Sequence, residues 1–225
     1  MNRSLAVLVS LLAALAGAAD LPPAEFKGQL EAQGGLLLDV RTPGEVARGK
    51  LAGASVLDFN GPKFEQKLSL IARDKPVFVY CASGNRSGQA AALMTKLGFT
   101  KVYNLAGGIG AWKAGGLPVE SGGAAPLASG EGVTPEAFDA LIKKEKRLLV
   151  DFQTPWCTPC QKMVPVVDAL KSVKVLKVDL DQSEALGTRE KVQGVPVFVL
   201  YVDGKERGRL FGEQTREALE ALAKK

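Results

Sequence analysis

The sequence predicts an α/β protein made of two small domains, and three observations support this. Helix-like and strand-like segments alternate from residue 22 onwards, and the apolar strands lack period-two alternation, as expected of strands covered on both faces. A stretch rich in Gly, Ala and Ser at 121–132 has no hydrophobic period and is typical of a linker. With 225 residues, 46% of them hydrophobic, the chain can bury two cores. We therefore expect domains at 20–120 and 133–225.

Residues 1–19 have the pattern of a secretory signal peptide. Arg3 precedes an apolar run over 5–15, and small residues at 16–18 form an A-x-A-like cleavage site. The run is short for a membrane span, although an uncleaved anchor is the alternative. The pattern predicts a periplasmic or secreted protein, with no stable membrane insertion after cleavage.

The first domain is expected to contain a series of parallel strands linked by helices. Its helices are expected at 23–34, from 87 to about 97, and at 108–116, with strands at 36–40, 54–59, 75–81 and 101–105.

The second domain is expected to open with a helix at 134–146, because Thr134 is a good N-cap and Pro135 suits the first helical position. Strands are then expected at 147–152, 173–181, 195–204 and 205–212, with helices after the cysteine turn, at 183–192 and at the C-terminus.

The composition excludes several kinds of active site. The chain has no histidine, which removes Ser-His-Asp triads, Cys-His pairs and zinc-histidine sites. Three cysteines are too few for a disulfide scaffold and one short of an all-cysteine zinc site, so no metal or cofactor is expected. The net charge of +5 is spread along the chain, which argues against nucleic-acid binding. Cysteine redox or sulfur chemistry remains.

Cys81 ends a predicted strand just before a predicted helix. Backbone N–H groups and the helix dipole at such a position favour a thiolate. The small residues Ala82, Ser83 and Gly84 let the loop close into a cradle of amides, and Arg86 adds a positive charge able to hold an oxyanion. A small buried cysteine without function is the alternative reading of an isolated thiol.

The segment from "LLLDVRTPGEVARGKLAGASVLDF" through "CASGNRSGQAA" to "GFTKVYNLAGGIGAWKAGGLPVE" resembles a single-domain rhodanese over most of 22–120. The resemblance implies that Cys81 carries a persulfide, taking sulfur from a donor such as thiosulfate and passing it to a thiol acceptor. The persulfide would be stabilised by the loop residues Ala82, Ser83, Gly84, Asn85, Arg86 and Ser87. Related phosphatases have five residues between Cys and Arg, whereas this chain has four, so sulfur is favoured over phosphate.

Two further features of this segment are interpreted as structural. The rhodanese resemblance assigns Asp39 and Arg41 to the framework. Lys50 in "GKLAGA" departs from the "GHIPGA" of many rhodaneses, and its effect is expected on local packing rather than on the chemistry.

Cys157 and Cys160 form a C-x-x-C motif after a buried strand, the spacing of a reversible disulfide at a helix start. A zinc site would need a second ligand pair. A structural bridge closing so short a loop would restrain the unfolded chain little. A redox role is therefore favoured.

Residues from about 131 to 225 resemble thioredoxin. The resemblance implies that Cys157 is the attacking thiol and Cys160 the resolving thiol, with Asp151 as a buried acid serving Cys160. The supporting residues of the redox site would be Trp156, Pro159, Lys177, Val195 and Pro196, with Pro165 kinking the active-site helix. Gln153 replaces a family tryptophan, and only 127–133 is available for the first edge strand.

The leading hypothesis is an exported sulfurtransferase coupled to a thiol-disulfide oxidoreductase, in which Cys157 could also reduce Cys81. It would use an external redox protein as partner. One alternative is an oxidoreductase whose first domain serves only for partner docking or sulfur binding, and another is a sulfur carrier without turnover. Pro159 is typical of reducing relatives while export favours oxidation, so the redox direction stays open.

Overall fold

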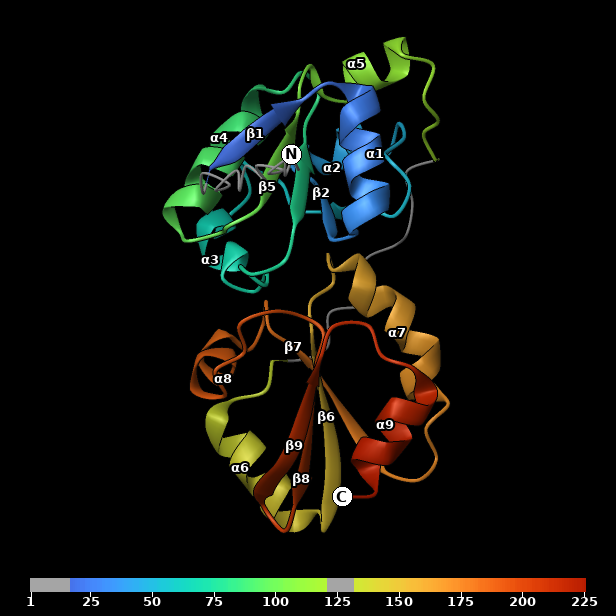
Figure 1. The fold of residues 1–225 in the computed structure, drawn as a ribbon. Coiled ribbons are helices and arrows are strands. Elements are labelled where there is room, and N and C mark those ends of the chain that lie inside the picture. The colour runs from blue at the N-terminus through green and yellow to red at the C-terminus, as the bar shows by residue number, and fades with distance from the viewer. Residues whose placement is uncertain (1–16, 121–131) are drawn as a thin grey trace, which may run out of the picture.

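The computed structural model of the chain describes residues 17–120 and 132–225, which form an N-terminal and a C-terminal α/β domain (Figure 1). The predicted signal peptide, linker and edge strand fall largely outside these residues, so those assignments stay predictions. No helix in the two described ranges has both the length and the apolar character that crossing a membrane requires.

The N-terminal domain is built on a parallel sheet. Its strands lie in the order β1 (Ala18–Leu21), β5 (Val102–Leu105), β4 (Val77–Tyr80), β2 (Leu36–Asp39) and β3 (Ser55–Val56). Strand β1 was not expected, because its residues overlap the end of the predicted signal peptide. It pairs with β5 from Ala18, two residues before the expected domain start.

Helices cover both faces of this sheet. On one face lie α1 (Pro23–Gln33) and α5 (Gly108–Ala114), and on the other α3 (Phe64–Leu68) and α4 (Asn85–Lys96). Successive side chains of β4 point to opposite faces of the sheet. Phe78 and Tyr80 pack on the face covered by α1, while Val79 and then Cys81 pack on the face covered by α4. The short helix α2 (Pro43–Val46) follows β2 and, like α3, was not expected from the sequence.

The C-terminal domain has a mixed sheet. Its order is β7 (Lys174–Asp179), β6 (Arg147–Gln153), β8 (Val197–Val202) and β9 (Lys205–Phe211), with β6 and β7 parallel and the other pairs antiparallel. One face packs on α6 (Pro135–Lys144) and α8 (Glu184–Arg189), and the other on α7 (Thr158–Asp168) and α9 (Arg216–Ala223). As expected, Thr134 caps α6, accepting a hydrogen bond from the Ala137 amide.

The two domains contact each other through apolar side chains from both sides. Leu70 of the N-terminal domain packs against the C-terminal core on the α6 and α8 side. Trp156 of the C-terminal domain packs against the N-terminal core on the α3 and α4 side. Because each domain covers an apolar residue of the other, the interface stabilises this arrangement of the domains.

Candidate functional site

Cys81 lies directly after β4 and four residues before α4, as the sequence predicted. Its side chain is buried, and the Gly84 amide lies 3.1 Å from its Sγ. Burial opposes ionisation, but hydrogen bonds outweigh it and lower the pKa of the Cys81 thiol. The donors are the hydroxyl and amide of Ser87 and the amides of Ser83 and Gly84. The Ser87 hydroxyl is buried and makes no other hydrogen bond among the described residues.

The shape of the Cys81 loop depends on two glycines. Gly84 has φ +94°, a left-handed conformation that L side chains rarely adopt. Gly108, at φ +58°, packs so closely under the loop that an added Cβ would lie 2.5 Å from the Cys81 carbonyl oxygen. The amide of Ile109 donates to that same oxygen at 2.9 Å. The start of α5 thus packs against the Cys81 loop and fixes its backbone.

Arg86, predicted to hold an oxyanion, is paired with a carboxylate of the same domain. Its Nη1 and Nη2 donate to the two carboxylate oxygens of Glu45 at 2.8 and 2.6 Å. The Arg86 hydrogen bond is the main cause of a Glu45 pKa of about 2, aided by hydrogen bonds from Thr42. Sequence reasoning missed Glu45. The Thr42–Glu45 capping box at the start of α2 could have revealed the helix, though not the distant partner.

Asp39 and Arg41 form a buried ion pair of 2.6 Å at the end of β2, consistent with a structural role. Tyr80 donates to Asp39 at 2.7 Å, tying the pair to β4. Lys50 is also buried, but its Nζ donates to the Ala54 carbonyl at 2.7 Å and lies 3.4 Å from a Glu120 carboxylate oxygen. The lysine that replaces the usual histidine at this position is therefore buried with its charged group satisfied by hydrogen bonding.

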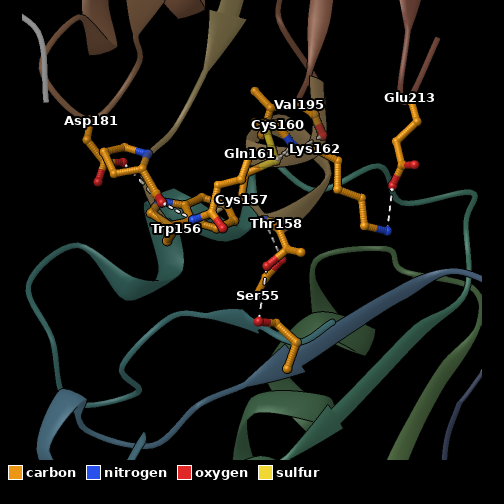
Figure 2. Close-up of a disulfide and its surroundings, with 12 residues drawn as sticks. Ser55, Trp156, Cys157, Thr158, Cys160, Gln161, Lys162, Asp181, Val195 and Glu213 are labelled. Carbon is orange, nitrogen blue, oxygen red and sulfur yellow. Dashed lines mark hydrogen bonds and ion pairs between the residues drawn. A yellow bond between two sulfur atoms is a disulfide. The ribbon is translucent and has the colours of Figure 1, made fainter. Parts of the chain in front are cut away.

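Cys157 and Cys160 form a disulfide at the N-terminus of α7 (Figure 2). The Cys160 amide donates to Cys157 Sγ at 3.1 Å. Val195 precedes a cis Pro196, and its carbonyl oxygen lies 3.8 Å from the same sulfur. These residues come from two separate turns, as the sequence predicted. Trp156 is held to one side by a 3.1 Å hydrogen bond from its Nε1 to Asp181.

Asp151 lies in the middle of β6 and is almost fully buried, with one carboxyl oxygen that has no partner among the described residues. Burial raises its pKa from 3.8 to about 7, against the opposing charge of Lys177. Lys177 is the register neighbour of Asp151 on β7, and its Nζ donates to Asp168. A carboxyl poised near neutrality is suited to exchanging a proton with a thiol.

The other predicted support residues occupy the expected elements. Pro159 lies in the first turn of α7 and Pro165 inside it, while Gln153 ends β6 and is buried with an unpartnered side-chain oxygen. Asn85 is the first residue of α4. Within 17–120 and 132–225, no group of three or more His, Cys, Asp or Glu residues is arranged to hold a metal ion.

The two sulfur sites do not face each other. Cys157 borders a cavity lined by Leu36 and Val77, the first residues of β2 and β4. Cys81 follows the last residue of β4, roughly 13 Å further along the strand at ~3.3 Å per residue. The cavity beside Cys157 thus lies at the opposite end of β4 from Cys81, and the attack of Cys157 on Cys81 stays a prediction.

Comparison with known families matches the two halves separately. The model of the rhodanese-like domain family matches residues 22–115, and that of the thioredoxin family matches residues 131–225. The chain is a rhodanese–thioredoxin fusion. Its first domain belongs to the rhodanese-like family and its second to the thioredoxin family.

Known relatives resemble one domain each. A sulfurtransferase of Allochromatium vinosum is 43% identical over 84 residues, covering 37% of this chain and 77% of its own. Thioredoxin of Chlamydia trachomatis is 37% identical over 82 residues, covering 35% of this chain and 80% of its own. Chloroplastic thioredoxin Y1 of Arabidopsis thaliana is 31% identical over 86 residues, covering 36% of this chain but only half of its own. Together with the Cys157–Cys160 bridge, these matches identify a thiol-disulfide oxidoreductase carrying a sulfurtransferase-like domain.

Proposed function

We propose that the fusion protein performs two sulfur reactions on separate external substrates, sulfane-sulfur transfer at Cys81 and thiol-disulfide exchange at Cys157 and Cys160. The observation that carries the first activity is the cradle around Cys81, in which loop amides and the Ser87 hydroxyl lower the thiol pKa despite burial. The same donors would stabilise the negative charge of a persulfide.

The proposed transfer begins with a donor such as thiosulfate. The Cys81 thiolate attacks the outer sulfur of thiosulfate, and sulfite leaves with the electron pair of the broken S–S bond. An acceptor thiolate then attacks the outer sulfur of the Cys81 persulfide, forming an acceptor persulfide and restoring the Cys81 thiolate. Because Arg86 is engaged by Glu45, we assign persulfide stabilisation to the amides and Ser87 rather than to the guanidinium.

In the proposed exchange, the reduced Cys157 thiolate attacks a substrate disulfide and releases one substrate thiolate. Cys160 then attacks Cys157 Sγ, releasing the second thiolate and closing the disulfide, while Asp151 accepts the Cys160 proton. Two electrons pass to the substrate, and an external dithiol restores the pair. The same steps run in reverse for oxidation.

The two activities are tested by reciprocal substitutions in the full chain. Cys81→Ser should abolish thiosulfate-dependent transfer to a thiol acceptor while leaving disulfide exchange unchanged, and Cys157→Ser should do the opposite. Transfer that persists in Cys81→Ser would refute the assignment of the persulfide. Loss of both activities in either variant would contradict separate sites.

We also propose that the chain is exported, on the strength of Arg3 and the apolar run over 5–15. Cleavage after Ala18 would leave residues 19–21 of β1 to pair with β5. The test is N-terminal sequencing of the protein from periplasmic and cytoplasmic fractions. A cytoplasmic protein with an intact N-terminus would contradict export.

A further inference from the structure

A cavity of about 650 Å³ lies beside the redox disulfide, and its walls come from both domains. The residues that matter most are Trp156, Cys157 and Pro196 on one side and Leu36, Ile71 and Pro76 on the other. Cys157 itself is only 2% exposed. A substrate therefore reaches the sulfur through a space that the rhodanese-like domain helps to enclose.

Hydrogen bonds fix the rhodanese-like domain against the redox turn. The Thr158 amide donates to Ser55 Oγ at 3.0 Å (Figure 2). The Thr158 hydroxyl donates to the Ala54 carbonyl at 3.1 Å. The Val56 amide contacts the Trp156 carbonyl at 3.4 Å. Ser55 and Val56 thus form hydrogen bonds with the main-chain groups on both sides of Cys157.

The loop before Pro196 is covered as well. A Cβ added at Gly194 would lie 3.4 Å from Ala72, so the two domains are already in close approach there. Both turns that flank the disulfide are therefore in contact with the rhodanese-like domain.

Two ion pairs join the domains beside this interface. Lys67 lies 2.7 Å from Asp181, the residue that also accepts from Trp156, and both side chains of the pair are largely buried. Lys63 lies 2.6 Å from Glu184 in a more exposed pair. Because Lys63 and Lys67 belong to the α3 region, changing them alters docking without replacing a residue of either sulfur site.

We propose that the rhodanese-like domain acts as a wall that restricts the redox pair to low-molecular-weight disulfides and excludes folded protein disulfides. This inference rests on the proposed exchange activity of Cys157 and Cys160. A space of 650 Å³ lies within the range of roughly 300–1,000 Å³ that holds small molecules. A folded protein would need the main-chain groups around Cys157 that the rhodanese-like domain already occupies.

Each turnover balances as a two-electron reduction. The Cys157 thiolate breaks the substrate S–S bond and forms a mixed disulfide, and one thiolate leaves and is protonated by water. Cys160 displaces the second thiolate from Cys157, and its own proton passes to Asp151. The oxidised protein carries the Cys157–Cys160 bridge.

The test compares two substrates in single-turnover reactions of the pre-reduced full chain, with the reductant removed. Hydroxyethyl disulfide is the small probe and insulin the folded one, and formation of the Cys157–Cys160 bridge is followed by thiol alkylation and mass spectrometry. We expect the rate constant for hydroxyethyl disulfide to exceed that for insulin by about tenfold or more, a difference of ~1.4 kcal/mol in barrier. A chain that reacts with insulin as fast as with the small probe overturns the proposal.

Opening the interface should remove the selectivity. In Lys63→Glu/Lys67→Glu, both ion pairs become like-charge contacts, and small-angle scattering should show the domains apart. The insulin rate constant should then rise about tenfold, while that for hydroxyethyl disulfide stays within about twofold. Lys113→Glu, an exposed change in α5 away from the interface, is the charge control and should leave both constants unchanged.

Insulin reactivity must follow domain separation for the proposal to stand. Separated domains without a gain for insulin, or a gain while the domains remain docked, would overturn it. If the redox pair itself is inactive, neither substrate closes the bridge in any variant, and that result refutes the proposed exchange activity instead.

Discussion

The Cys81 loop and the Cys157 turn occupy the same structural position but surround their sulfur atoms differently. Each cysteine follows a β-strand and precedes a helix whose N-terminal amides approach its sulfur, from Gly84 in one case and Cys160 in the other, both at 3.1 Å. Around Cys81 the neighbours are hydrogen-bond donors, whereas Cys157 has a second thiol three residues away. The comparison teaches that the two sites differ in the neighbours of the sulfur rather than in its position in the fold.

The largest effect is expected at Asp151, which belongs only to the redox site. Asp151→Asn should slow disulfide exchange by about a hundredfold, because it removes the group that accepts the Cys160 proton. The pH profile of exchange should also lose its inflection near 7, the pKa of this carboxyl. Sulfur transfer at Cys81 should be unaffected. Full exchange activity with the inflection retained would show that Asp151 plays no part in proton transfer.

The same substitution should stabilise the fold. The folded pKa of about 7 lies above the ordinary 3.8, so ionisation of Asp151 opposes folding, and the penalty is complete above pH 7. As pH falls through 7 the penalty declines, and it vanishes below about 3.8. Chemical denaturation at pH 8 should give Asp151→Asn a gain on the order of 4 kcal/mol that disappears near pH 3. A gain equal at both pH values, or a loss at pH 8, would contradict the burial argument.

The next effect is expected at Ser87, whose hydroxyl supports only the Cys81 site. Ser87→Ala should raise the Cys81 pKa and slow sulfur transfer near neutral pH by about tenfold, the effect of one hydrogen bond to a charged group. The pH–rate profile should move to higher pH. Ser83→Ala is the matched control, because Ser83 contributes its backbone amide. Equal effects of the two changes would remove the Ser87 hydroxyl from the cradle.

The smallest effect is expected at Glu45. Glu45→Gln removes the negative charge that neutralises Arg86, so kcat/KM for anionic thiosulfate should rise about threefold. An uncharged donor such as dimethyl trisulfide should be unaffected. Glu31→Gln, in an exposed i,i+4 pair on α1, serves as the control. A fall in thiosulfate use would show that the Arg86–Glu45 pair itself positions the donor.

Local sequence patterns predicted where the two cysteine turns lie, because each cysteine sits in a single connection between one strand and one helix. The C-x-x-C turn, the Cys81 loop and the cap at Thr134 lie where local residues placed them. Pro196 lies beside the disulfide, as the thioredoxin resemblance implied. Strand β1 was missed because its small residues also fit a cleavage site, and α2 and α3 because helices of four and five residues carry too little periodicity.

Features that depend on distant pairing could not be read from the sequence. Arg86 meets Glu45 across 41 residues, and Ser55 meets Thr158 across 103. Nothing local to these residues indicates their partners. Arg86 and Glu45 meet only when the N-terminal domain has folded, and Ser55 and Thr158 meet only when the two domains have docked. For this reason the neutralised Arg86 and the enclosed Cys157 emerged only from the structure.

The central claim is that Cys81 and the Cys157–Cys160 pair work as separate sulfur sites. Peptide mass spectrometry of the full chain after treatment with thiosulfate and removal of the donor tests it most directly. We predict one additional sulfur on Cys81 with Cys157 and Cys160 bridged, and the same persulfide on Cys81 in a Cys157→Ser/Cys160→Ser variant. Absence of sulfur from Cys81, or its dependence on Cys157 and Cys160, would contradict the account.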